Sequence, residues 1–405
     1  MKNKLVIACS LMFSSLVQAS DVSGTYTSFI NDMYQESDVV RAKALELEAE
    51  LLRANQTSYY YLPKITADSK YKTDPGRGDI FDSKLSANAL IYSTSITERF
   101  KEKDSKIRGA EISLLKEKEN LYKSVVENLI GIKYYTALDD KANKLERTAI
   151  DLYNQIEGRY LSGIAKASDV EQARLLIQKI KTESESINKE IELLKANIEL
   201  STGIKFPERG IELPNNILNK IDGYNTDEEN IRNNLDYKLM NAQALAAKSN
   251  AKQQDTLMQV SLVADEKYNN SLRVEKDSYV GVQVTLNIFD FDKKIASKAG
   301  MLSYQTLKTK MDFKYKELFA KLRSLQLTSN SNEKELQGLE EQRKTTGMIL
   351  ASQKREYNIS QSSYYEMLNT QYDYFALERK ISEIKIAYAI NKVSLLQVSG
   401  ELLNL

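Results

Sequence analysis

The sequence lacks the residue types on which most active sites and metal sites depend. It contains no histidine and no tryptophan, and its one cysteine is Cys9. Histidine and cysteine are the usual ligands of transition metals and the usual bases and nucleophiles of enzymes. The carboxylates that remain lie among lysine and arginine at helical spacing, which indicates solvated helix faces. We therefore expect no catalytic residue, no metal site and no cofactor, and we expect that the protein is not an enzyme.

Helix breakers and excess charge are also scarce. The 405 residues include 4 prolines and 15 glycines, which favours long helices. The formal net charge is +1, with 57 basic and 56 acidic residues interspersed along the chain. A nucleic-acid-binding protein normally shows a basic face, so we expect no nucleic-acid partner.

Long hydrophobic runs are absent except at the N-terminus. Two lysines in residues 1–4 precede an apolar run at residues 5–17 and small residues up to Ala19, the pattern of a signal peptide over residues 1–19. The alternative is a lipoprotein acylated at Cys9, but this leaves about four apolar residues where about seven or more are needed. No later run approaches the roughly 20 apolar residues of a spanning helix, so any membrane crossing must use strands.

The two halves of the chain resemble each other at a displacement of about 197 residues. The segment "ADSKY" at 67–71 aligns with "ADEKY" at 264–268, and "LSANALIY" at 85–92 aligns in the same register with "VQVTLNIF" at 282–289. This period is far longer than that of solenoid repeats, so each copy is half of the protein.

Each half, residues 20–217 and 218–405, has the same predicted order of helix, strand pair, long helix and helix. The predicted ranges are 31–62, 66–91, 93–157 and 168–202 in the first repeat, and 228–258, 262–289, 292–355 and 365–399 in the second. Apolar residues three or four apart along the long helix are typical of a coiled-coil face. The long helix would extend roughly 95 Å, and the two shorter helices laid end to end would match it.

The clearest strand pattern lies in the second repeat. Val280, Val282, Val284, Leu286 and Ile288 alternate with small or polar residues, as in a barrel strand whose apolar side faces lipid. The alternative is a small soluble sheet packed on protein. Four strands cannot close a membrane barrel, whereas three copies of the chain would supply twelve strands and an open lumen. Candidate aromatic residues for the membrane interfaces are Tyr71, Tyr92, Tyr268, Tyr279 and Phe289.

Two related turn segments lie between the long helices and the helices that follow them. In "RYLSGIAKASDVEQAR", residues 159–174, Gly163 permits the left-handed backbone of a tight corner and Asp169 suits the start of the next helix. A weaker copy, "REYNISQSSYYEMLNTQ", covers residues 355–371 and has Ser360 at the glycine position.

Taken in this order, these segments resemble the TolC-type outer-membrane efflux protein family over essentially the whole mature chain. "YLPKITADSKY" at 61–71 leads into the first strand, "VGVQVTLNIFDFDKK" at 280–294 covers the fourth, and 159–174 is similar to the turn of the family. The resemblance implies a mainly α fold with membrane β-structure. It would form a trimeric twelve-stranded outer-membrane barrel, four strands per chain, continued by a long, internally duplicated α-helical periplasmic barrel.

The resemblance also implies a function. The homotrimer would be a channel-tunnel in the outer membrane of a Gram-negative bacterium, extending into the periplasm. It would serve a tripartite efflux or type I secretion system as a passive exit duct for small compounds or secreted proteins. Its partners would be outer-membrane lipid, a periplasmic adaptor protein, and an inner-membrane pump or ABC exporter. The alternative is a periplasmic adaptor or coiled-coil scaffold protein, which should carry one hairpin and a compact β-rich domain.

Carried over by position, the resemblance implies two sets of site residues. The gate or constriction residues would be Glu366, Asn369, Asp169 and Tyr357, with Asn369 replacing an acid of the family. The adaptor would dock at the two tips, formed by Leu161, Ser162, Gly163, Ile164, Asn358, Ile359, Ser360 and Gln361.

Overall fold

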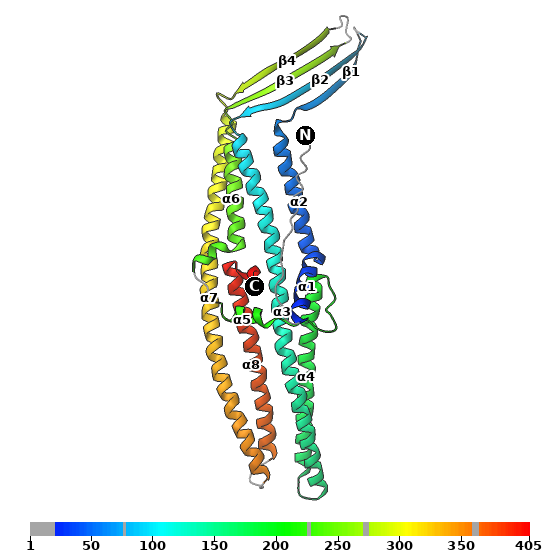
Figure 1. Cartoon of the computed structure of the whole chain (residues 1–405), viewed down its shortest axis with the longest axis vertical. Helices are drawn as coiled ribbons and strands as arrows, with labels where there is room; N and C mark the ends of the chain where they lie inside the picture. The colour runs from blue at the N-terminus through cyan, green and yellow to red at the C-terminus, as the bar shows by residue number, and fades with distance from the viewer. Residues whose placement is uncertain (1–20, 76–77, 225–227, 270–274, 359–363) are drawn as a thin grey trace.

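Long helices run along one axis, and a single sheet lies at one end of them (Figure 1). The computed structural model describes residues 21–75, 78–224, 228–269, 275–358 and 364–405, so the predicted signal peptide lies outside the described residues. Every helix within these described ranges is too short or too polar to span a lipid bilayer.

The first repeat contains four helices and two strands. In chain order they are α1 (Asp21–Glu36), α2 (Asp38–Ser58), a 3₁₀ turn η1 (Tyr59–Tyr61), β1 (Lys64–Asp74), β2 (Gly78–Ser93), α3 (Ile96–Leu161) and α4 (Ala167–Thr202). The predicted single helix over residues 31–62 is wrong in one respect, because the chain leaves helical geometry at Ser37 and forms two helices.

The second repeat has the same order. It contains α5 (Asn215–Asp222), η2 (Glu228–Asn233), α6 (Leu235–Gln253), β3 (Met258–Asn269), β4 (Glu275–Leu286), α7 (Phe291–Asn358), α8 (Tyr364–Ser399) and η3 (Leu402–Asn404). Adding 197 to the ends of α4 (167 + 197 = 364 and 202 + 197 = 399) gives the ends of α8. The duplication predicted from the sequence is therefore present in the fold.

Short helices stack end to end along each long helix, as predicted. Helix α3 packs against α2 and α6 in the half nearer the sheet, and against α4 and α8 in the other half. Helix α7 packs mainly against α6 and α8, with η2 beside it, and forms one edge of the layer (Figure 1). With 66 residues in α3 and 68 in α7, each long helix extends about 100 Å.

Two joints, where one short helix ends and another begins, have matching chemistry. In the first repeat the Ser37 hydroxyl donates to the carbonyl of Ser201 (3.3 Å), next to Gly203 in the left-handed conformation (φ 75°). In the second, the Asn234 amide donates to the carbonyl of Gln397 (3.1 Å), next to Gly400 (φ 72°). A glycine can end a helix in the left-handed backbone conformation, which would strain any other residue at that position.

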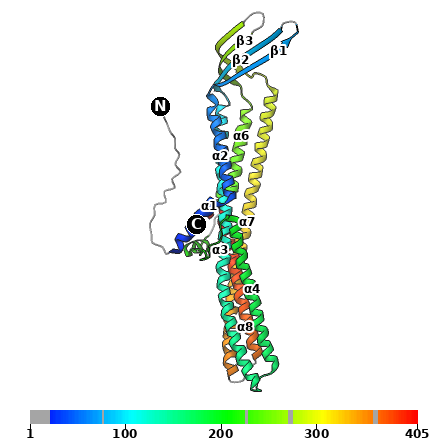
Figure 2. The same cartoon turned by 90° about the vertical axis from the view of Figure 1, so that its right-hand side faces the viewer.

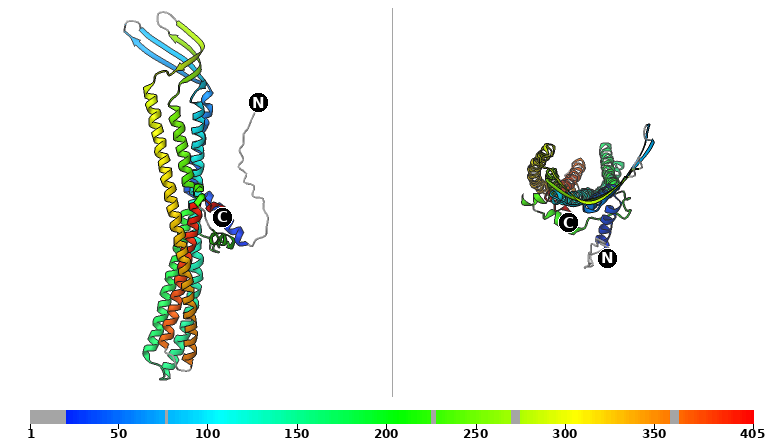
Figure 3. Two further views of the ribbon diagram at one scale, coloured as in Figure 1. Left: turned by 90° about the vertical axis from the view of Figure 1, so that its left-hand side faces the viewer. Right: turned by 90° about the horizontal axis from the view of Figure 1, so that it is seen from above.

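The main core surrounds these joints and lies at mid-height. Tyr26, Phe29 and Met33 of α1 are buried there against α3, and the Tyr26 hydroxyl donates to that of Tyr122 (3.1 Å). Helix α1, helix α5 and the C-terminus all lie on one side of the helical layer (Figures 2 and 3). Viewed from above, that side is the convex side of the curved sheet (Figure 3).

The sheet has the simple antiparallel order β1-β2-β3-β4. A register shift between Leu90 and Tyr92 marks a bulge in β2, and such bulges increase the twist of a sheet. Strands β1 and β4 are edge strands, and each pairs with one neighbour within the described chain. The sheet is therefore open at both sides.

Candidate functional site

One face of the sheet is apolar and uncovered. Val280, Val282 and Val284 of β4 are 75, 62 and 55% exposed. Each lies opposite an apolar residue of β3, as in the pair Val282 and Leu262. The predicted apolar face is thus continuous across β3 and β4. The prediction for Ile288 is wrong, because β4 ends at Leu286 and Ile288 lies in the bend that follows.

The opposite face of the sheet is polar. The Tyr279 hydroxyl donates to Asp265 (2.6 Å), and the Lys84 ammonium lies 3.4 Å from the same carboxylate. Gln283 and Ser261 form a pair on this face. Tyr279 is predicted among the interfacial aromatic residues, but strand alternation places it with the polar side chains. One apolar face and one polar face match a barrel wall between lipid and water.

Aromatic side chains flank the apolar face near the far end of the strands. Tyr71 pairs with Phe81, and Tyr268 lies opposite Ser83. Tyr268 is ten residues from Met258 at the helical end, so the two are about 34 Å apart along the strand. With a tilt of about 40–45° this corresponds to about 25 Å, the usual height of the apolar band in outer-membrane barrels.

The helical layer also has exposed apolar side chains at both of its edges. On α7 they recur at intervals of 7, 11, 14 and 21 residues, which places them in one stripe: Ile295, Leu302, Phe313, Leu327 and Met348. On α4, at the other edge, they are Leu175, Leu193 and Leu200. These two stripes are surfaces for which the described chain provides no covering element.

The corner between α3 and α4 is a tight turn closed by glycine. Gly163 has φ 73°, its amide donates to the carbonyl of Tyr160 (2.9 Å), and the amide of Ile164 donates to that of Arg159 (2.8 Å). These bonds satisfy carbonyls at the helix end. Leu161 and Ile164 project from the turn and are 79 and 76% exposed, so the tip presents apolar side chains to solvent, and Ser162 lies between them.

Asp169 has a local role in the structure. Its carboxylate accepts from the backbone amide of Lys166 (3.3 Å), at the start of α4. A carboxylate in the first turn also complements the helix dipole. This confirms Asp169 as a helix-start residue, while its predicted part in a gate stays a prediction.

Tyr357 lies between the two hairpins near their tips. Its ring is 4.2 Å from that of Tyr364, centroid to centroid, and the Arg159 guanidinium lies 4.6 Å from its centroid. The Tyr357 hydroxyl has no hydrogen-bond partner among the described residues, so no hydrogen bond joins it to Asp169.

The other predicted gate residues lie at the start of α8. Glu366 and Asn369 are exposed and one helical turn apart, whereas Met367 and Leu368 between them are buried. In the second tip, Asn358 is the last residue of α7, and residues 359–361 lie outside the described residues.

Reasoning from the sequence missed two contacts between hairpins. The Arg159 guanidinium contacts the ring of Tyr357. This contact was not predicted, although Arg159 belongs to the turn segment identified from the sequence. Glu378 of α8 is 5% exposed, and its carboxylate bonds Lys141 of α3 (2.6 Å) and Arg343 of α7 (3.4 Å). Because Glu378 lies among other charged residues at helical spacing, the sequence predicted a solvated position for it. No local pattern distinguishes Glu378 from the exposed carboxylates.

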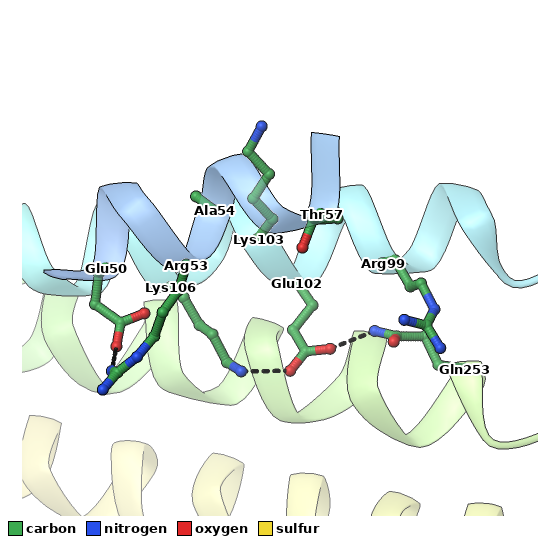
Figure 4. Close-up of a pocket in the computed structure, with 9 residues that line it drawn as sticks. All are labelled: Glu50, Arg53, Ala54, Thr57, Arg99, Glu102, Lys103, Lys106 and Gln253. Atoms are coloured by element: carbon green, nitrogen blue, oxygen red, sulfur yellow. Dashed lines mark hydrogen bonds and ion pairs between the residues drawn. The ribbon is translucent and has the colours of Figure 1, made fainter. Parts of the chain in front are cut away.

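A groove of about 210 Å³ near the sheet is lined by charged side chains that pair with one another (Figure 4). The buried Glu102 of α3 accepts from Lys106 (2.8 Å), Asn250 (3.2 Å) and Gln253. Arg53 forms an ion pair with Glu50. These bonds join α3 to α6, and residues of α2 line the other side of the groove.

Solved structures with this fold include outer-membrane proteins. CusC, whose crystal structures concern folding and transmembrane channel formation, superposes with a TM-score of 0.77 at 14% identity over 95% of both chains. VceC of Vibrio cholerae gives 0.76 at 13% identity, over 93% of this chain and 96% of its own. The open-state MtrE channel of Neisseria gonorrhoeae gives 0.75 at 14% identity, over 93 and 89%. No protein-family model matches the sequence, and no curated protein matches it.

These comparisons confirm the predicted fold, a mainly helical chain with four antiparallel strands in a duplicated order like that of the outer-membrane channels. The fold differs from the alternative, because the described residues contain two hairpins and an open sheet, with no compact β-rich domain.

Proposed function

We propose that three copies of the chain form an outer-membrane efflux channel that extends into the periplasm. The observation that carries the proposal is the open sheet, with an uncovered apolar face and a polar face, at the end of helices about 100 Å long. The channel is a passive conduit that catalyses no reaction and needs no cofactor.

Closure of the barrel requires three chains. Each chain contributes four strands with unpaired edges on β1 and β4, and β4 of one protomer would pair with β1 of the next. Such head-to-tail contacts close into a ring when the rotation fits. Twelve strands enclose a lumen, whereas eight leave an interior filled by side chains. The far half of the α7 stripe would meet the stripe on α4 in the same interface, and the half nearer the sheet would meet α2.

The partners follow from the shape of the periplasmic end. A passive duct needs an energy source, which would be an inner-membrane pump or an ABC exporter joined through a periplasmic adaptor. The exposed Leu161 and Ile164 support adaptor docking at the tips. Both tripartite efflux and type I secretion are compatible with this arrangement, and the cargo would be small compounds or secreted proteins accordingly.

A constriction near the tips would limit the resting channel. Glu366 and Asn369 are exposed in the first turns of α8, and three copies of Glu366 around one axis would favour cations. Tyr357 and Asp169 would belong to the contacts that hold the tips together.

The two faces of β4 provide the test of this function. Val284→Arg places a cation on the apolar face, which costs roughly 2–4 kcal/mol per strand near the bilayer midplane. Outer-membrane trimers and their conductance in planar bilayers should be lost. Gln283→Arg, on the polar face, should retain both. Equal loss in the two variants, or a conducting species with a different number of chains, would contradict the proposal.

A further inference from the structure

A groove lies beneath the segment that connects the two repeats. Residues 203–214 leave α4 at Gly203, pass over α3 and α4 and enter α5. The cavity beneath this segment has a volume of about 800 Å³, which is within the range of ligand-binding sites in proteins. The connecting segment lies on the side of the helical layer that carries α1, α5 and the C-terminus (Figures 2 and 3).

The groove combines an apolar floor with charged groups at its rim. Ile132 of α3 and Ile191 of α4 contribute to the floor, and Lys133 and Lys195 stand on the same two helices. Arg209 approaches from the connecting segment and takes part in no ion pair of the described chain. Glu208 and Glu212 also line the groove, so the lining contains three cations and two carboxylates.

One wall of the groove is an extended chain with unpaired backbone groups. Ile211 and Leu213 are buried while Glu212 between them is exposed, the alternation of a strand. Pro214 favours an extended conformation at the residue before it. The amides and carbonyls of Ile211, Glu212 and Leu213 form no hydrogen bond within the described part of the chain. Unpaired extended backbone is a template for strand addition.

The position of the groove excludes lipid as its occupant. Ile132 follows Ile96, the first residue of α3, by 36 residues, which places it about 54 Å along the helix from the sheet. The apolar stripe of α4 includes Leu193, which lies on a different face of that helix from Ile191. The groove thus opens on the outer surface, away from the edges where neighbouring copies would meet.

We infer that this groove binds an extended peptide segment of a partner protein, one that alternates apolar and acidic residues. The peptide would pair with the backbone of residues 211–213, place its apolar side chains on the floor, and bring its carboxylates to Lys133, Lys195 and Arg209. The inference rests on the proposed trimer, which places the groove on its outer surface, but it does not depend on conduction, because the groove lies outside the proposed channel.

The test uses the full-length trimer in detergent and a fluorescent six-residue probe of alternating valine and glutamate. Fluorescence anisotropy should give a Kd on the order of 10–100 μM. A probe of alternating valine and lysine should bind at least tenfold more weakly. N-methylation of alternate amides in the acidic probe should abolish binding, since the probe then cannot pair as a strand. Binding that survives N-methylation would overturn strand addition.

A charge reversal with a matched control locates the site. Arg209→Glu should weaken binding of the acidic probe at least tenfold and improve binding of the lysine probe. Lys205→Glu, in the same segment but outside the groove, should leave both affinities unchanged. Single-channel conductance should be the same in both variants. Failure of the acidic probe to bind the wild-type trimer, or equal effects of the two substitutions, would overturn the proposal.

Discussion

The two long helices are counterparts in the duplication, yet their surroundings differ. Helix α3 is interior and packs against four helices, whereas α7 forms an edge and packs against two. Val126 and Leu138 are fully buried in α3. Their counterparts in α7 are Arg323 and Glu335 (126 + 197 = 323 and 138 + 197 = 335), and both are exposed. The same repeat position therefore carries an apolar residue where a neighbour covers it and a charge where none does.

The apolar side chains that α7 retains are the informative ones. Phe313 and Leu327 are 68 and 65% exposed although most of the exposed surface of α7 is polar. An exposed apolar stripe at coiled-coil spacing marks a helix that meets a partner. Since the described chain supplies none, the contrast with α3 supports the proposed ring of three copies.

The largest expected effect comes from breaking this edge. Phe313→Asp combined with Leu327→Asp should abolish the trimer, because each buried apolar side chain contributes about 2 kcal/mol at each of the three interfaces. Light scattering after size-exclusion chromatography should show protomers. Lys308→Asp, exposed on another face of α7, should leave trimers intact. Intact trimers in the double variant would mean that α7 is not an interface.

The two joints allow a second comparison between the repeats. A Cβ atom added to Gly400 would lie 2.3 Å from the carbonyl oxygen of Asn233, whereas one added to Gly203 would lie 3.6 Å from that of Glu36. Both glycines have positive φ, which costs other residues roughly 1–2 kcal/mol. At Gly400, unlike at Gly203, the neighbouring backbone also leaves no room for a Cβ atom.

Alanine substitutions at the two glycines should therefore differ in effect. Gly400→Ala should destabilise the fold by about 4 kcal/mol, since the backbone at Asn233, the end of η2, must move as well. Gly203→Ala should cost about 1–2 kcal/mol. Thermal unfolding of the two variants at one heating rate would measure the difference. Equal losses would show that the close approach at Gly400 relaxes without cost.

A buried carboxyl group near the second joint gives a prediction about pH. Burial and the nearby Asp236 raise the pKa of Glu119 to about 7, despite the opposing effect of Lys123 and Lys116. Between pH 4.5 and 7 the folded chain keeps a proton that the unfolded chain releases. The free energy of unfolding should therefore fall as pH rises through this window, by at most about 3 kcal/mol.

Glu119→Gln should remove this pH dependence, because the amide stays neutral. The variant should match the wild type at pH 4 and exceed its unfolding temperature at pH 8. The counterpart of Glu119 in α7 is Lys316 (119 + 197 = 316), which is exposed. Lys316→Gln should leave the pH profile unchanged. A wild-type profile that is flat from pH 4.5 to 7 would contradict the assignment.

The sequence was sufficient to predict the fold because its signals are long and repeated. Apolar spacing along the long helix and two copies in one register predicted the element order, and α4 and α8 begin within one residue of their predicted ranges. The errors lie where one residue ends an element. Ser37 interrupts a helix through packing at the joint, and β4 ends before Ile288 although the apolar alternation continues.

The candidate site was less predictable, because its contacts join residues far apart in sequence. The turn at Gly163 follows from a local backbone requirement and was predicted. The bonds of Glu378 to two other helices depend on how the hairpins pack, which charge spacing does not reveal. The roles of Glu366 and Asp169 in a gate concern three chains around an axis, so they remain predictions from the resemblance.

The smallest expected effect concerns the contact between the two hairpin tips. The Arg159 guanidinium lies over the ring of Tyr357, which joins the first hairpin to the second, and such contacts contribute about 1 kcal/mol. Arg159→Gln should raise the open-to-closed ratio in planar bilayers roughly fivefold per protomer. Arg174→Gln is the matched control, since Arg174 lies over Tyr153 within one hairpin and its loss should leave conductance unchanged. If both substitutions raise basal conductance equally, the contact between hairpins does not hold the tips. If neither does, Tyr357 serves packing at the tip, where its ring contacts Tyr364.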